Sequence, residues 1–180
     1  MRLSRHLGRL LATELLAVAL ASCAPINVGS YVDRRINFAQ YGTYDWGPVE
    51  AFATGDPRLD NNPFFQERLT HAVESRLAAR GLEKSTSATP QLLIHYHASV
   101  SQQISPDGAD QNNGSCAGCQ PYVYEAGTIV LDFIDTRTNR LVWRGWTEGS
   151  IEGVINNQAW MEKRIDEAVA RILEKFPRRL

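Results

Sequence analysis

Two periods of apolar residues run along the chain, and together they predict five strands and two helices. Apolar stretches, and stretches in which apolar and polar residues alternate, are typical of strands when turn residues bound them. Such stretches cover Ile26–Val32, Thr43–Trp46, Gln91–Ser101, Thr128–Asp135 and Leu141–Ser150. The segments Gly47–Asn62 and Ile104–Gln120 are rich in Gly, Pro, Asp, Asn or Ser and predict loops.

The two predicted helices have clear boundary residues. Asn62 is suited to cap the first helix, Pro63 to occupy its first position and Gly81 to follow its end. Its apolar stripe consists of Phe65, Leu69, Ala72, Val73 and Leu77. The second helix is expected over roughly Gln158–Phe176, and it ends there because Pro177 restricts the residue before it. Its stripe consists of Ile165, Ala168, Val169, Ile172, Leu173 and Phe176.

The last two strands form a hairpin whose register follows from its turn. Arg137, Thr138 and Asn139 fit a three-residue loop whose last member adopts the left-handed conformation that asparagine tolerates. The resulting pairs are Phe133 with Trp143 and Leu131 with Gly145 on the core side, and Asp132 with Arg144, Ile134 with Val142 and Val130 with Trp146 on the other side. A different loop type would shift this register by one residue and exchange the two faces.

These elements predict an α+β fold, a two-layer sandwich in the order ββαβββα. Four to five largely antiparallel strands and two amphipathic helices pack most economically when both helices cover one face of the sheet. The opposite face would display candidate partner-binding residues, namely Val130, Ile134, Val142, Trp146, His95 and His97. This face is either an exposed surface for a protein or lipid partner, or it is covered by the two long loops. Trp160 is either a further contact residue or a tryptophan at the edge of the core.

The first 22 residues have the composition of an export signal. Arg2, Arg5 and Arg9 form a positive segment, an apolar run follows, and small residues precede Cys23. The run is too short for a transmembrane helix. Residues 20–23, Leu-Ala-Ser-Cys, resemble a bacterial lipobox.

The resemblance to lipoproteins implies that Cys23 is the first residue of the mature protein. It would carry a diacylglycerol on its thiol and a third acyl chain, such as palmitate, on its amine, and this anchors stably where one chain would not. Ala24 follows where an aspartate would favour the inner membrane. The resemblance therefore implies the periplasmic side of the outer membrane of a Gram-negative bacterium. The alternative is an ordinary secretory signal with a coincidental cysteine.

This interpretation divides the chain into three parts. Residues 1–22 are the expected signal peptide, 23–25 a lipidated N-terminus and short tether, and 26–180 a single domain. The 158 residues that remain after removal of the signal suffice for one domain with a substantial core. Three arginines and one glutamate leave with the signal, which changes the formal net charge from −1 to −3. We exclude nucleic acid as a partner because no basic stripe remains.

Two pairs of residues could carry chemistry. His95 and His97 share one face of a predicted strand, where two imidazoles can bind one metal ion. Cys116 and Cys119 lie in the second long loop and could complete a tetrahedral zinc site if that loop folds back. In an oxidising compartment they could instead form a disulfide bond that closes the loop, or remain thiols. The histidines could equally be solvated strand residues.

Several short motifs resemble the DUF4136 family of bacterial envelope lipoproteins. They are Asn37-Phe38, Thr43–Trp46, the helix with Arg68, Val73, Leu77 and Gly81, the strand Leu92–Ile94, the strand Leu141–Gly145 and the closing Ile172–Pro177. They cover nearly all of the expected mature chain and are mostly fold signatures. The family is a domain of unknown function, so the resemblance implies no catalytic residues.

Catalytic patterns are weak in this sequence. We find no convincing nucleophile elbow, carboxylate dyad or phosphate-binding glycine loop. Asp132 and Asp135 leave opposite faces of their strand. We therefore expect a non-enzymatic outer-membrane lipoprotein without a cofactor, which binds an envelope protein or lipid partner or supports the envelope. The alternative is a zinc-binding or thiol-redox envelope enzyme that uses His95, His97, Cys116 and Cys119.

Overall fold

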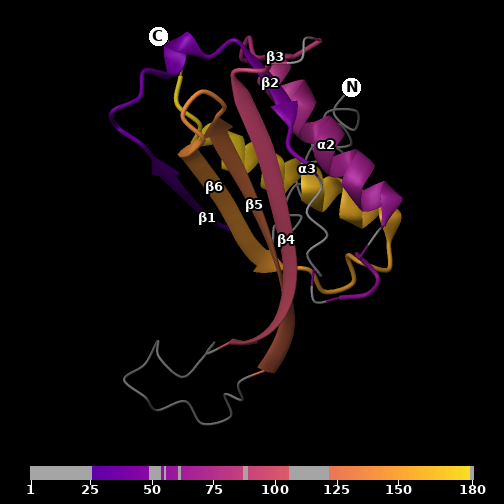
Figure 1. Ribbon diagram of the computed structural model, residues 1–180. Helices are drawn as coiled ribbons and strands as arrows, with labels where there is room; N and C mark the ends of the chain where they lie inside the picture. Colours follow the sequence, from indigo (N-terminus) through magenta and orange to yellow (C-terminus); the bar gives the residue numbers. More distant parts are fainter. Residues whose placement is uncertain are drawn as a thin grey trace, which may run out of the picture.

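The computed structural model describes residues 26–48, 54, 56–60, 62–86, 89–105 and 122–178. A mixed six-stranded sheet forms one layer, and two helices on one of its faces form the other (Figure 1). The predicted α+β class and the helices on one face are confirmed. The predicted count of four to five strands is too low by one, because a two-residue strand of exposed polar residues carries no apolar pattern.

The strands lie in the order β1-β6-β5-β4-β2-β3. Their bounds are β1 Ile26–Val32, β2 Thr43–Trp46, β3 Glu83–Lys84, β4 Leu92–Ser105, β5 Tyr122–Asp135 and β6 Arg140–Ser150. The β1–β6, β6–β5 and β5–β4 pairs are antiparallel, as predicted for most of the sheet. Strand β2 instead runs parallel to both of its neighbours.

Both helices begin at asparagine caps. Helix α2 spans Pro63–Ala78, and the side chain of Asn62 accepts a hydrogen bond from the Phe65 amide. Helix α3 spans Gln158–Glu174 and is capped in the same way by Asn157. A short 3₁₀ helix, Phe38–Gln40, joins β1 to β2. Among the described residues, no helix is long and apolar enough to cross a membrane.

The β5–β6 hairpin confirms most of the predicted register. Phe133 pairs with Trp143 and Asp132 with Arg144, and Asn139 adopts a φ of 52° at the turn. The register shifts between Phe133 and Ile134, so Ile134 pairs with Leu141 instead of Val142. Predicting Val142 on the outer face was therefore wrong, because the irregularity turns this side chain into the core, where it is fully buried.

Strands β4 and β5 are longer than the sequence pattern predicts. Strand β6 pairs with β5 only as far as Ala126, so the last residues of β4 and the first of β5 pair with each other alone. They extend beyond the rest of the sheet as a two-stranded arm (Figure 1). The predicted loop over Ile104–Gln120 thus includes residues that belong to the arm.

The core lies between the helices and the sheet. Both apolar helix stripes and the inward side chains of β4, β5 and β6 contribute to it. At one end Phe133, Trp143 and Phe176 form an aromatic cluster, with ring centroids 4.8–5.1 Å apart. These rings lie on the face of the sheet that α2 and α3 cover (Figure 1).

Candidate functional site

The face of the sheet opposite α2 and α3 carries residues from four strands in two rows. Cα pairing puts Gly29, Trp146, Val130 and His97 in the first row. The second row consists of Tyr31, Arg144, Asp132 and His95. Because side chains alternate between the faces of a strand, both rows point away from the helices. We call these two rows the outer rows.

The centre of the outer rows is an ion pair with a buried carboxylate. Asp132 is only 5% exposed, and it accepts hydrogen bonds from Nε and Nη2 of Arg144. These bonds raise the pKa of Arg144. The Nε2 atom of His97 lies 3.7 Å from the same carboxylate. The predicted Asp132–Arg144 pairing is confirmed, and the geometry fixes the orientation of the guanidinium on the open face.

An exposed aromatic area lies beside this ion pair. The indole of Trp146 lies over Gly29, where an added Cβ would come within 2.2 Å of the ring. Trp146 nevertheless keeps 38% of its surface exposed, and Tyr31 in the neighbouring row keeps 49%. The face over β1 and β6 is thus open. Tyr31 was missed by sequence reasoning, although its alternation within β1 could have placed it there.

The histidines lie toward the opposite side of this face. The ring of His95 lies against Gly47, where an added Cβ would come within 2.2 Å of Nε2. Both histidines line a cleft of about 190 Å³ at the β4 edge, together with Trp46, Tyr96 and part of α2. Within the described ranges, no group of three or more His, Cys, Asp or Glu residues is arranged to hold a metal ion. Cys116 and Cys119 lie outside those ranges, so the four-ligand site stays a prediction.

The remaining predicted face residues contribute less exposed surface. Val130 and Ile134 are half-buried, and Val142 is in the core. Leu59, from the first long loop, packs in the core cluster on the helix side instead of covering the outer rows. Cys23 also lies outside the described residues.

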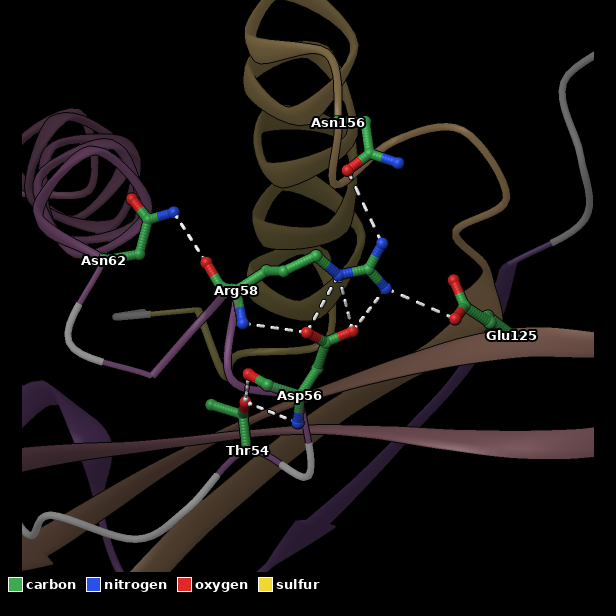
Figure 2. Close-up of polar contacts among 6 residues, drawn as sticks. All are labelled: Thr54, Asp56, Arg58, Asn62, Glu125 and Asn156. Atoms are coloured by element: carbon green, nitrogen blue, oxygen red, sulfur yellow. Dashed lines mark hydrogen bonds and ion pairs between the residues drawn. The ribbon is translucent and has the colours of Figure 1, made fainter.

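A second feature, an arginine network, joins three segments at the base of the arm. Asp56 accepts hydrogen bonds from the amide and Nε of Arg58, 2.8 and 2.9 Å long, and Arg58 also reaches Glu125 and Asn156 (Figure 2). The bonds from Arg58 lower the pKa of Asp56. Sequence reasoning missed this network, although Asp-Pro-Arg at residues 56–58 is a pattern typical of a turn closed by an aspartate side chain.

An apolar cavity of about 60 Å³ lies next to the arginine network, between the sheet and the helix layer. Leu59 and Ile155, the chain neighbours of Arg58 and Asn156, line it, and so does Ile26 at the start of β1. Trp160 lies at the same end of the domain, beside Gly153, and is 59% exposed. Its role as a contact residue stays a prediction.

Together these features describe a two-layer α+β domain with one open sheet face and an apolar cavity at the end where the described chain begins. The family described as domain of unknown function DUF4136 matches residues 28–178. The chain therefore belongs to this family. A comparison with curated proteins finds no match.

Solved structures are similar to this chain at low sequence identity. A PDZ domain protein from Parabacteroides distasonis is 13% identical with a TM-score of 0.55, and the match covers 86% of this chain and 35% of that one. The PelC dodecamer from Paraburkholderia phytofirmans is 11% identical with a TM-score of 0.50, covering 87% of this chain and 100% of that one. A DUF4136 family protein from Bacteroides thetaiotaomicron is 14% identical with a TM-score of 0.46, covering 81% and 94%.

Proposed function

We propose that this protein is a non-enzymatic lipoprotein, anchored through Cys23 to the periplasmic side of the outer membrane, that binds an envelope partner through its outer rows. The observation that carries this proposal is the open aromatic area of Trp146 and Tyr31 beside the Arg144–Asp132 pair. Aromatic residues and arginine are enriched at the centres of protein interfaces. Because the central charges of this face already pair with each other, the face is better suited to binding a partner than to catalysing a reaction.

The anchor determines which partners are within reach. Only residues 24 and 25 separate Cys23 from Ile26, so the tether spans about 10 Å at most. Ile26 pairs with Gly149 at the end of the domain that also carries Trp160. We infer that this end faces the membrane, where tryptophan is favoured at the polar interface. The first outer row, with Gly29 and Trp146, then lies nearer the membrane than the second, with Tyr31 and Arg144, and proteins bound at the surface are within reach of both.

Photo-crosslinking in intact cells tests the partner surface. A photoreactive amino acid at position 31, next to Trp146, should give a specific adduct, and Trp146→Ala should weaken that adduct at least fivefold. The matched control is the same amino acid at Lys163, which is exposed on α3. Equal adducts at positions 31 and 163, or no loss with Trp146→Ala, would contradict the proposal. A second copy of this chain is one partner that the experiment can identify, because PelC forms a dodecamer.

The anchor has a separate test. Cells fed labelled palmitate should incorporate the label in the wild-type protein, and Cys23→Ser should abolish both the label and cleavage of the signal. Incorporation that persists in Cys23→Ser would place the lipid elsewhere and refute this anchor.

The rival function is a zinc or thiol-redox enzyme, and the proximity of His95 and His97 at one cleft is the observation that favours it. Metal analysis and thiol titration of the purified protein distinguish the two functions. Stoichiometric zinc that is lost with His97→Ala would support the enzyme. Protein without zinc and without free thiols would contradict the enzyme.

A further inference from the structure

The apolar cavity near Ile26 has walls from every layer of the domain. Strands β1, β4, β5 and β6, both helices and the segment before α3 contribute to its lining. Its narrow interior is formed mainly by aliphatic side chains, among them Ile26, Leu59, Val100, Ile129, Ile151 and Ile165. The sheet and the helices therefore do not close completely at this end of the sandwich.

The size and lining of this cavity define the chemistry of an occupant. One water molecule needs roughly 10–15 Å³ of such volume together with two to four polar partners. The cavity offers about 60 Å³, which exceeds the requirement for one water, but its lining is mostly apolar. Water gains little from entering a site of this kind, whereas burying methylene groups there is favourable. We propose that the cavity is a binding site for the end of a saturated acyl chain.

The chain path supplies the second argument, and it rests on the proposed lipidation of Cys23. Ile26 lines the cavity, and Cys23 is only three residues earlier in the sequence. A tether of this length holds the point where a chain is attached to Cys23 within about 10 Å of Ile26. Intramolecular attachment at this range gives effective concentrations in the millimolar region. The same end would also meet the acyl chains of membrane phospholipids.

The arginine network lies next to this apolar interior, because the chain neighbours of Arg58 and Asn156 line it, and the charged residues of the lining itself are Glu148 and Arg164. Arg58 joins Asp56, Glu125 and Asn156, and these residues come from three of the segments that meet beside the cavity (Figure 2). The Arg58 side chain is 43% exposed, whereas its neighbour Leu59 is only 8% exposed and lines the interior. An aliphatic interior with a few polar groups beside it is typical of sites for apolar ligands.

In-cell crosslinking with a diazirine-bearing fatty acid tests this site on the full chain. Cells incorporate the probe into lipoproteins and phospholipids, ultraviolet light activates it, and mass spectrometry locates the adducts. We expect adducts on cavity residues such as Ile129 and Ile165. An adduct that links a cavity peptide to the N-terminal peptide identifies the protein's own lipid, and an adduct with phospholipid mass identifies the membrane. Either source supports the proposal.

Matched variants make the test specific. Ala168→Phe places a ring in the cavity and should reduce the adducts at least tenfold, whereas Ala170→Phe, on the same helix but outside the lining, should not. Ala98→Leu fills the cavity from the sheet side and replaces Ala168→Phe if that variant does not fold. Adducts that are absent from the cavity, or unchanged in folded filling variants, would overturn the proposal.

The two proposals fail in distinguishable ways. Probe attached to Cys23 before irradiation reports lipidation directly, whatever the cavity does. Without that attachment, the anchor is refuted, and the cavity is tested by phospholipid adducts alone. With that attachment but no cavity adduct of either kind, the acyl-chain site is refuted and the anchor stands.

Discussion

Arg144 on β6 holds the buried carboxylate of Asp132 on β5 through two hydrogen bonds on the open face of the sheet. Asp132 is 5% exposed, whereas 45% of the Arg144 side chain is exposed. One partner is thus embedded in the sheet while the other remains accessible. This asymmetry lets the face present a cation of fixed orientation without leaving a buried charge unpaired.

Arg144→Ala should destabilise the protein by about 1–3 kcal/mol, because it leaves the Asp132 carboxylate buried without the two hydrogen bonds from the guanidinium. Urea unfolding measures this change. Arg140→Ala, at an exposed position three pairs closer to the turn, should change stability by less than about 0.5 kcal/mol. In a double-mutant cycle, Arg144→Ala should cost much less in an Asp132→Asn background. Equal costs in both backgrounds would show that the pair does not stabilise the fold.

Two glycines beside tryptophan rings should respond differently to alanine. A Cβ at Gly145 would lie 2.3 Å from the fully buried ring of Trp143 and 2.7 Å from Ile172, so neither neighbour can move without repacking. Gly145→Ala should cost about 1–3 kcal/mol, which is typical of overpacking. Gly29→Ala meets the ring of Trp146, which is 38% exposed and can swing into solvent.

The readouts for these variants separate stability from surface structure. Gly29→Ala should cost less stability than Gly145→Ala but should increase acrylamide quenching of tryptophan fluorescence, since it displaces Trp146. A stable Gly29→Ala variant with unchanged quenching would contradict the observed position of the indole.

The β5–β6 hairpin illustrates what the sequence could and could not predict. The turn residues determine the pairing of Phe133 with Trp143, because Asn139 tolerates a positive φ. The irregularity next to them depends on a distant strand, since the Val142 carbonyl accepts a hydrogen bond from the amide of Asp33. Local pairing rules contain no information about that contact, so the prediction for Val142 was wrong.

Strand β3 was missed for a related reason. Its two residues, Glu83 and Lys84, are exposed and polar, so they show no alternation of apolar and polar side chains. They pair with β2 because Gly81, at a φ of 76°, redirects the chain after α2. The Glu83 amide then donates to the carbonyl of Gly42. The helix end was predictable, but this backbone pairing follows from where the helix packs.

The arginine network and the cavity were missed because their parts are distant in sequence. Asp56 and Arg58 lie in a predicted loop, while Glu125 and Asn156 lie on elements far along the chain. Tertiary packing alone brings these groups together. By contrast, the outer rows were largely predictable, since alternation along each strand assigns faces without any tertiary information.

Asp135 should make the stability of the protein fall as the pH is lowered into the acid range. Burial raises the pKa of its carboxyl, but hydrogen bonds from Tyr41 and Thr138 outweigh burial and lower the pKa below its ordinary value. A carboxyl with a lowered pKa in the folded state stabilises fully above its unfolded pKa of about 3.9, and this contribution is lost as the pH falls through the folded value.

Asp135→Asn should therefore lower stability at pH 7 and reduce the loss of stability between about pH 4 and pH 2. Thermal unfolding at a series of pH values measures both effects. Asp33, whose pKa the hydrogen bonds from Arg35 lower to about 2, contributes to the same acid range and remains in the variant as an internal reference. An Asp135→Asn variant with the acid dependence of the wild type would contradict this assignment.

Arg58 should hold Thr54 and Asp56 against strands β4 and β5, and hydrogen exchange can detect its loss. The Val100 amide on β4 donates to the Thr54 carbonyl over 2.6 Å, and Thr54 is joined to Asp56 by its hydroxyl.

Arg58→Ala removes the guanidinium that links Asp56 to Glu125 and Asn156. Because Arg58 is partly exposed, its ion pairs stabilise the whole fold by only about 0–1 kcal/mol. The Val100 amide should nevertheless exchange at least tenfold faster, since local opening requires less free energy than global unfolding. The exchange rate of the Leu131 amide, in the interior of the sheet, should rise by no more than the loss of global stability predicts. Equal acceleration at both amides would show that Arg58 acts on the fold as a whole.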